Sequence, residues 1–117
     1  MIFGIGTDLC SIERMRESLE RTPNLAQRLF HENEIALPIN SLAARFAAKE
    51  ALAKALGNPR LLVWREIEIT KDQNGKPHVY LHGTTKDNVA RLGDFRIHLS
   101  IAHELELASA VVVVESN

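Results

Sequence analysis

The chain of 117 residues, 45% hydrophobic and 25% charged, has the size and composition of one soluble globular domain over residues 1–117. Its formal net charge of −1 gives no electrostatic reason to expect nucleic-acid binding, and no apolar run is long enough to cross a membrane. The single cysteine, Cys10, excludes an internal disulfide, and with an N-terminus unlike a signal peptide it indicates a cytoplasmic protein.

The chain begins with a predicted strand that is followed by a helix. Ile2–Leu9 is an apolar run in which Gly4 and Gly6 would let another backbone or a ligand come close. Asp8 stands at the C-terminal end of this strand, where a turn or N-cap role is the simplest interpretation. Ser11–Arg21 then has the pattern of a helix whose first residue, a serine, is the N-cap.

A long alanine-rich helix is predicted next. It follows a shorter helical stretch, Asn24–Ile35, which ends before Pro38. Ser41 is expected to cap the long helix, which runs to Leu56 and stops at Gly57. Its many alanines permit neighbouring elements to approach closely on several sides.

The second half of the chain contains stretches of alternating apolar and polar residues and, at its end, a β-branched run, both of which indicate strands. The expected elements are strands Trp64–Thr70 and His78–Gly83, a helix Thr84–Gly93, and strands Phe95–His103 and Leu107–Glu115. An Asn-Gly pair between the first two strands predicts a β-hairpin. The element order β-α-α-α-β-β-α-β-β predicts an α+β fold with a mainly antiparallel sheet packed with helices.

The charges of the long helix are placed unusually. On a helical wheel of about 100° per residue, the large apolar residues define one arc: Leu42, Phe46, Leu52 and Leu56. Arg45 and Lys49 fall inside this arc. Glu50 and Lys54 lie at its border. Because a surface helix keeps its charges opposite its apolar side chains, this arrangement indicates a partly buried polar site.

Two carboxylates and two cations form a candidate magnesium and phosphate site. If Asp8 and Glu50 converge, they offer two hard oxygen ligands with room for water or substrate oxygens, which suits Mg²⁺. Lys54 and Arg45 could then neutralise a phosphate group. This set points to phosphoryl-type chemistry. The simpler alternative for Glu50 and Lys54 is a solvated i, i+4 ion pair.

The spacing of the five histidines indicates no particular chemistry. His31, His78 and His82 show no metal-ligand spacing and are expected at surface or edge positions. Ser100 and His103, beside a glutamate, are the residue types of a hydrolase triad, but the G-x-S-x-G nucleophile elbow is absent. Walker-type and dinucleotide-binding glycine loops are absent as well.

Five sequence blocks resemble one enzyme family. They occur in order across nearly the whole chain: GIGTDLCSIER, ARFAAKEALAKALG, WREIEI, NGKPHVYLHG and IHLSIAHELELASAVVV. The pair GIGTDL and FAAKEA is the specific signature. The chain therefore resembles the holo-[acyl-carrier-protein] synthases, the short, homotrimeric class of the 4'-phosphopantetheinyl transferase superfamily.

The resemblance implies a reaction, a cofactor and a partner. Coenzyme A would donate 4'-phosphopantetheine to a serine of apo-acyl carrier protein in fatty acid biosynthesis, releasing adenosine 3',5'-bisphosphate. Asp8 and Glu50 match the family's Mg²⁺ ligands, and Lys54 matches the lysine that assists the transferring phosphate or the leaving group. Two candidates for the general base stay open, Glu50 and a metal-bound water.

The resemblance also implies contacts beyond the metal site. Arg45, Ser100 and His103 match positions that contact coenzyme A phosphates. In a homotrimer the last two would serve the site of a neighbouring subunit. Arg14 and Arg21 belong to the helix expected to meet the acidic helix of the carrier protein, to which arginines are complementary.

Several alternatives stay open at this point. The segment between Glu34 and Ser41 is shorter than the family's usual one, so contacts made there are not carried over. Lys49 belongs to the motif and would serve in packing or in phosphate binding. A non-catalytic coenzyme A or carrier-protein binding module and a purely structural trimer are the alternatives to an enzyme.

Overall fold

Three long strands form the larger of two sheets in the computed structural model, which describes residues 1–117. They are, in spatial order, β1 (Ile2–Ser11), β5 (Leu107–Ser116) and β4 (Phe95–Glu104). The smaller sheet is the hairpin of β2 (Ile67–Lys71) and β3 (Pro77–Leu81). All strand pairs are antiparallel, so the predicted α+β class is confirmed, with the strands divided between two sheets.

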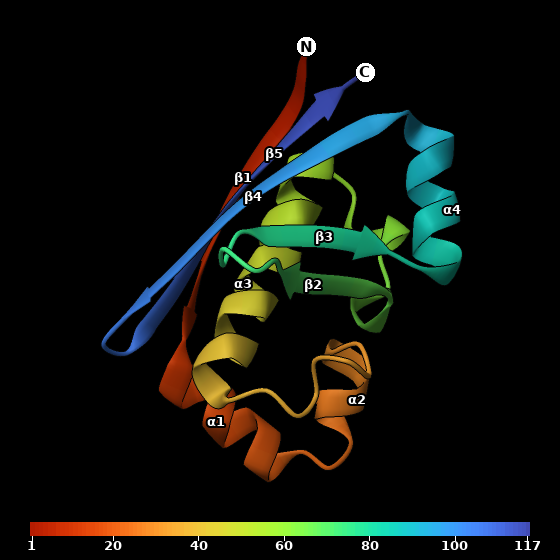
Figure 1. Ribbon diagram of the computed structural model, residues 1–117. Helices are drawn as coiled ribbons and strands as arrows, with labels where there is room; N and C mark the ends of the chain where they lie inside the picture. The colour runs from red at the N-terminus through yellow and green to blue at the C-terminus, as the bar shows by residue number, and fades with distance from the viewer.

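Helices surround and separate these sheets. The α-helices are α1 (Ile12–Arg21), α2 (Leu25–Leu29), α3 (Ile39–Leu56) and α4 (Gly83–Leu92). Two short 3-10 turns follow α3, η1 (Pro59–Leu61) and η2 (Trp64–Glu66). Figure 1 shows α3 between the larger sheet and the β2–β3 hairpin, with α1 and α2 at its N-terminal end. No helix is both long and apolar enough to cross a bilayer.

The helix α3 approaches β1 closely because β1 has glycines at the contact. A Cβ added to Gly4 would lie 1.9 Å from the carbonyl oxygen of Ala55. One added to Gly6 would lie equally close, 1.9 Å, to the carbonyl oxygen of Ala51. Both distances are far inside van der Waals contact, so no side chain fits at either position. The expectation of a close neighbour is confirmed, and that neighbour is the backbone of α3.

The helix α3 is enclosed by protein on almost every side. Each of its alanines is at most 7% exposed. One side packs on β1 and β5, while the other joins Ile67, Ile69 and Val89 in the same core cluster. A helix enclosed in this way has no solvent face opposite an apolar face, which is why its charges lie among its apolar side chains.

The start of α3 differs from the sequence prediction. The helix begins at Ile39, directly after Pro38, so the expected cap at Ser41 is wrong. The proline has a fixed φ that suits a helix start, and its carbonyl already accepts from the Leu42 N–H at 3.0 Å. The predicted stop is confirmed, since Gly57 ends the helix in the left-handed conformation with φ 79°.

The helical stretch predicted over Asn24–Ile35 is shorter than expected. The helix α2 ends at Leu29, and a turn follows. In this turn Glu34 Oε1 accepts from the His31 N–H at 2.9 Å, and the Phe30 side chain is buried in the core. A side-chain oxygen that satisfies a backbone N–H offers the chain an alternative to helix, which explains the early end.

The strand β1 extends further than predicted and carries Asp8 within it. Pairing with β5 continues past Asp8, opposite Ala110, as far as Ser11, opposite Leu107. The expectation that Asp8 ends the strand is wrong, because the long β5 strand supplies pairing partners beyond that residue. Ser11 is the N-cap of α1, as predicted, and its hydroxyl accepts from the Arg14 N–H at 3.2 Å.

Candidate functional site

Asp8, Glu50 and Lys54 form a cluster of charges where β1 crosses α3. Lys54 Nζ lies 3.0 Å from Asp8 Oδ1 and donates to the Thr7 carbonyl, also at 3.0 Å. Glu50 lies one helical turn before Lys54, on the same side of α3. The structure therefore brings the two predicted metal ligands together with the predicted lysine, in what we call the carboxylate–lysine cluster.

Negative charge dominates the carboxylate–lysine cluster. Burial raises the pKa of Glu50 above its usual value, the Asp8 carboxylate raises this pKa further, and Lys54 opposes the rise. Burial also raises the pKa of the neighbouring Cys10 thiol, and both carboxylates add to that effect. One ammonium group therefore does not balance two carboxylates, and a cation bound between them would relieve their repulsion.

The donor set of this cluster fits a hard divalent cation. Mg²⁺ prefers oxygen ligands and is usually held by one or two carboxylates, with positions left for water and substrate phosphates. The side chains of Asp8 and Lys54 are 18% and 56% exposed, so solvent and substrate can reach them. A cavity of about 310 Å³ beside them is lined by Glu50, Lys54 and Trp64 among others. The sequence did not single out Trp64, and its only signal was to be the one tryptophan of the chain.

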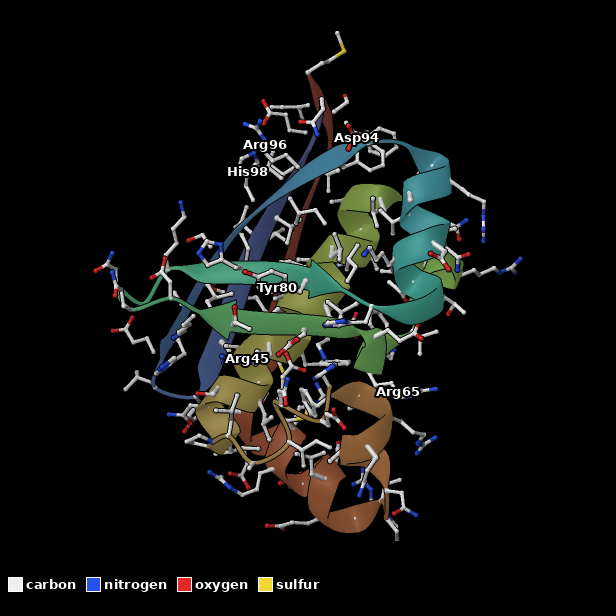
Figure 2. All side chains as sticks on the ribbon, turned by 45° about the vertical axis from the view of Figure 1, so that its right-hand side comes forward. Arg45, Arg65, Tyr80, Asp94, Arg96 and His98 are labelled. Atoms are coloured by element: carbon white, nitrogen blue, oxygen red, sulfur yellow. The ribbon has the colours of Figure 1, made fainter.

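Arg45 does not reach the carboxylate–lysine cluster. Figure 2 shows this residue beside β2, where its Nε donates to the Ile69 carbonyl at 3.0 Å. Its Nη1 donates to the Ser41 carbonyl at 3.4 Å. Burial lowers the pKa of Arg45, and the Glu34 carboxylate opposes this effect. To contact a coenzyme phosphate, the Arg45 guanidinium would have to break its hydrogen bonds to these carbonyls. The predicted role of Arg45 in phosphate binding therefore stays a prediction.

Lys49 is part of a buried ion pair with Glu34. Its ammonium donates to Glu34 Oε1 at 2.6 Å and to the carbonyls of Leu29 and Trp64 at 2.9 and 3.1 Å. These three bonds use all the donors of an ammonium group. Glu34 Oε2 in turn accepts from the Ile69 N–H at 2.9 Å. Of the two roles that the sequence left open for Lys49, the structure therefore supports packing.

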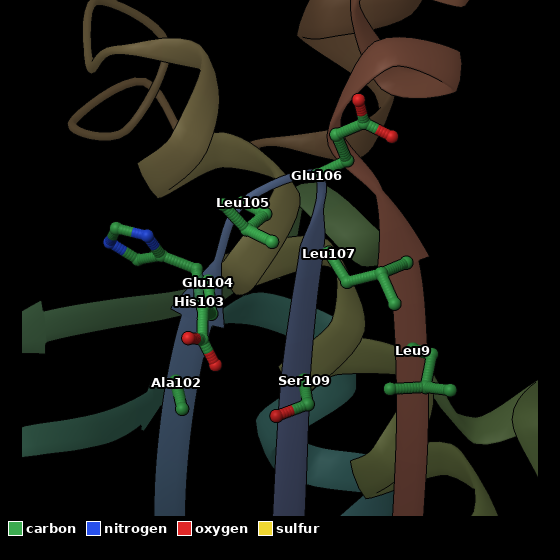
Figure 3. Close-up of a pocket in the computed structure, with 8 residues that line it drawn as sticks. All are labelled: Leu9, Ala102, His103, Glu104, Leu105, Glu106, Leu107 and Ser109. Atoms are coloured by element: carbon green, nitrogen blue, oxygen red, sulfur yellow. The ribbon is translucent and has the colours of Figure 1, made fainter.

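Ser100 and His103 do not join the cluster within one chain. The strand β5 separates their strand, β4, from β1. Alternation along β4 directs Ser100 to the sheet face that α3 leaves uncovered. Figure 3 shows His103 at the end of β4, projecting away from β5, at the rim of a hollow of about 900 Å³ that also includes Leu9 and Leu107.

The uncovered face of the larger sheet is apolar. Its large apolar side chains come from β1 and β5 and are each at least 43% exposed: Ile5, Leu9, Leu107 and Val111. Monomeric proteins rarely expose a contiguous apolar surface of this kind. This face is therefore a candidate contact surface with another protein chain.

Arg14 and Arg21 are both exposed on α1. Seven residues separate them, which is close to two helical turns, so they lie on the same side of the helix. Arg14 also lines a small cavity with Cys10 and Phe46, next to the carboxylate–lysine cluster. The helix therefore presents positive charge at the edge of the cluster.

The fold and the cluster together define an α+β protein with two carboxylates and a lysine beside a cavity. Residues 4–110 match the 4'-phosphopantetheinyl transferase superfamily, and the chain belongs to this family. It is 50% identical over 120 residues to the holo-[acyl-carrier-protein] synthase of Streptomyces avermitilis, a match that covers 97% of this chain and 98% of that protein.

Solved structures of the same kind of enzyme resemble the fold closely. The crystal structure of holo-[acyl-carrier-protein] synthase from Neisseria meningitidis has a TM-score of 0.89 and 35% identity, over 99% of this chain and 100% of that one. The synthase from Bacillus anthracis, in complex with CoA (3',5'-ADP), has a TM-score of 0.83 and 33% identity. That match covers 100% of this chain and 99% of the other.

Proposed function

We propose that this protein transfers the 4'-phosphopantetheine group of coenzyme A to a serine of apo-acyl carrier protein. The observation that carries the proposal is the meeting of Asp8, Glu50 and Lys54 beside a cavity, in a chain similar to holo-[acyl-carrier-protein] synthases. The similar structure in complex with CoA supports coenzyme A as the donor substrate. The products are holo-acyl carrier protein and adenosine 3',5'-bisphosphate, and we assign the reaction to fatty acid biosynthesis in the cytoplasm.

The proposed transfer forms one bond to phosphorus and breaks another. The serine oxygen of the carrier bonds to the β-phosphorus of coenzyme A. The oxygen that bridges the two phosphorus atoms leaves with adenosine 3',5'-bisphosphate, and the serine proton passes to a base. Because the substrates carry the reacting groups, the protein mainly contributes positioning and charge neutralisation.

Each member of the carboxylate–lysine cluster has a role in this proposal. Asp8 and Glu50 would hold Mg²⁺, which polarises pyrophosphate oxygens when it is bound. The Lys54 ammonium, fixed by Asp8 and by the Thr7 carbonyl, would neutralise charge on the leaving oxygen. The raised pKa of Glu50 makes its carboxylate a stronger base than an exposed glutamate, so it stays a candidate acceptor of the serine proton.

We further propose that the active form is a homotrimer with its sites between subunits. The apolar face of the larger sheet supports this, because a second copy of the chain would cover it. Ser100 lies on the same face, so a neighbouring copy would bring Ser100 and His103 to the coenzyme phosphates. Arg14 and Arg21, exposed on α1, would contact the acidic helix of the carrier protein.

The proposed activity is tested by the mass of the carrier protein. Purified protein, coenzyme A, Mg²⁺ and apo-carrier protein should together give a carrier heavier by one phosphopantetheine group, as measured by mass spectrometry. Coenzyme A binding without a mass gain, on a panel of carriers from fatty-acid and secondary metabolism, would instead identify a binding module. The absence of both coenzyme A binding and a mass gain would identify a structural trimer.

The shared site is tested by complementation between two inactive variants. Glu50→Gln removes a cluster residue, and His103→Ala removes a residue proposed to act in the neighbour's site. Co-expressed chains should form mixed trimers in which some sites contain neither substitution, so activity should return. If the mixed assembly stays as inactive as the two separate variants, the two residues do not act across a subunit boundary.

A further inference from the structure

A second group of possible metal ligands lies outside the carboxylate–lysine cluster. His31 follows α2, Glu68 lies on β2 and His82 follows β3, and one potential ligand atom from each lies within 4.8 Å of the other two. His82 Nε2 is 2.9 Å from Glu68 Oε1. The imidazole rings of His31 and His82 lie side by side, with centroids 4.8 Å apart and their planes tilted by 30°. Two imidazoles and a carboxylate from three segments of the chain therefore meet at one place.

We propose that His31, Glu68 and His82 bind one divalent transition-metal ion, with Zn²⁺ as the fitting ion. Two histidines and one carboxylate are a donor set that Zn²⁺ uses, with water in the fourth position. Imidazole suits Zn²⁺ and its neighbours in the periodic table, whereas Mg²⁺ prefers oxygen ligands alone. This donor set therefore selects a different ion from that of the carboxylate–lysine cluster.

Asn33 holds one of the three ligands, Glu68, in place and contacts a second, His31. Its Nδ2 donates to Glu68 Oε2 at 3.0 Å, which leaves Oε1 directed at His82. Its backbone N–H donates to His31 Nδ1 at 3.1 Å, so that nitrogen presents a lone pair. The bond to Glu68 orients a ligand from outside the coordination sphere, and partners of this kind strengthen metal binding about 10- to 100-fold.

Metal binding requires only small changes in this arrangement. Zn²⁺ would bind to His31 Nδ1 and replace the hydrogen bond from the Asn33 N–H. Because Asn33 is exposed, its N–H would then donate to water. The ion also takes the place of the proton between His82 Nε2 and Glu68 Oε1, and the His82 ring then carries its proton on Nδ1. Donor atoms around a tetrahedral Zn²⁺ are about 3.4 Å apart. Ligand atoms now up to 4.8 Å apart therefore approach by about 1.4 Å at most, and His82 Nε2 and Glu68 Oε1, now 2.9 Å apart, separate slightly.

The bound ion would link the turn after α2 to the β2–β3 hairpin. Figure 1 shows these two regions next to each other, and the bond between Asn33 and Glu68 already joins them. The same turn carries Glu34, the partner of buried Lys49. We therefore assign the ion a stabilising role in the fold, separate from phosphopantetheine transfer.

A histidine–aspartate pair at the other end of the hairpin provides a matched control. His78 Nε2 lies 3.1 Å from Asp72 Oδ2 and has about the same exposure as His82. It therefore presents a histidine and a carboxylate on the same hairpin, but it belongs to no group of three ligands. His78→Ala removes an equivalent imidazole without touching the proposed site.

The test is a titration of the full-length chain, without an affinity tag, with Zn²⁺ in the presence of excess Mg²⁺. Calorimetry should give one Zn²⁺ per chain, and Co²⁺ as a spectroscopic probe should show the intense visible bands of a four-coordinate site. His31→Ala and His82→Ala should each weaken Zn²⁺ binding at least about tenfold. His78→Ala and Glu50→Ala should bind as the unchanged chain does, and Zn²⁺ should raise the melting temperature of both.

Three results would overturn the proposal. The first is the absence of Zn²⁺ binding to the unchanged chain. The second is equal affinity in the His82→Ala and His78→Ala variants, which would place the ion elsewhere. The third is a loss of Zn²⁺ binding in Glu50→Ala with binding kept in His31→Ala, which would assign the ion to the carboxylate–lysine cluster.

Discussion

Two lysines of α3 pair with carboxylates from other segments, and their surroundings are opposite. Lys49 and its partner Glu34 have side chains that are 0% and 1% exposed. Lys54 and its partner Asp8 have side chains that are 56% and 18% exposed. The first pair uses every donor of the ammonium group on fixed protein oxygens. The second lies beside an open cavity and a second carboxylate, Glu50.

The difference separates a structural ion pair from one that we propose to be functional. No buried side-chain nitrogen or oxygen in the molecule lacks a hydrogen-bond partner, so the buried pair has nothing left to offer a ligand. The carboxylate–lysine cluster instead holds like charges together and raises the pKa of Glu50. Such a site costs stability without a ligand and gains from binding a cation. The predictions below test this contrast, from the largest expected effect to the smallest.

The largest effect is expected from Lys49→Met. This change leaves the buried Glu34 carboxylate with only Arg45 Nε, 3.9 Å away, as a cation. Losing the closer partner of a buried pair costs about 3–5 kcal/mol. Urea unfolding should show this loss. The matched variant Lys54→Met should change the free energy of unfolding by about 1 kcal/mol or less, because an exposed pair contributes little. Equal losses in the two variants would remove the distinction between the pairs.

The second effect is a loss of activity without a loss of stability. Glu50→Gln should lower the rate of phosphopantetheine transfer at least about 100-fold, which corresponds to about 2.7 kcal/mol. Its free energy of unfolding should stay equal or rise, because repulsion between Glu50 and Asp8 disappears. Asp87→Asn, at an exposed position of α4, is the control that should change neither quantity. A Glu50→Gln protein that is inactive because it unfolds would contradict this view.

The third effect is stabilisation by Mg²⁺. At free Mg²⁺ about one hundred times the dissociation constant, binding should stabilise the fold by about 2.7 kcal/mol. The melting temperature in Mg²⁺ is compared with the melting temperature in Na⁺ at the same ionic strength, so that electrostatic screening is held constant. The upward shift should be absent in Asp8→Asn and Glu50→Gln. A shift of the same size in these variants would place the cation elsewhere.

The smallest effect concerns a surface carboxylate whose hydrogen bonds are already satisfied. Although partial burial opposes it, hydrogen bonds from the backbone and hydroxyl groups of Thr84 and Thr85 lower the pKa of Glu66 to about 2. A carboxyl with a lowered pKa stabilises the fold above its unfolded value, near pH 4.5, and this contribution is lost as the pH falls toward about 2. Glu66→Ala should lose about 1 kcal/mol at neutral pH and show a flatter acid unfolding curve over that window. An unchanged acid unfolding curve would mean that the hydrogen bonds between Glu66 and the first turn of α4 do not stabilise the fold.

Local patterns predicted the elements and most of the site. Alternation identified β4 and the hairpin, and a β-branched run identified β5. Glycine marked both the end of α3 and its close contact with β1. The charges bordering the apolar arc of α3 drew attention to Glu50 and Lys54, which the structure places beside Asp8. The errors at Asp8 and Ser41 arose where a strand partner or a proline outside the local pattern decided the boundary.

The sequence by itself determined the family and the α+β class, because each depends on short motifs and their order along the chain. It named the members of the carboxylate–lysine cluster, but the packing of β1 on α3 brought Asp8 to Lys54. Only the tertiary structure decided that Lys49 is buried against Glu34 and that Arg45 faces β2. It also decided that His31 and His82, far apart in the chain, lie side by side. Periodicity reports which side of an element a residue occupies, but an enclosed helix has a different neighbour on every side. Which neighbour a charge meets is set by long-range packing, and that packing separates the structural charges of α3 from those that we propose to be functional.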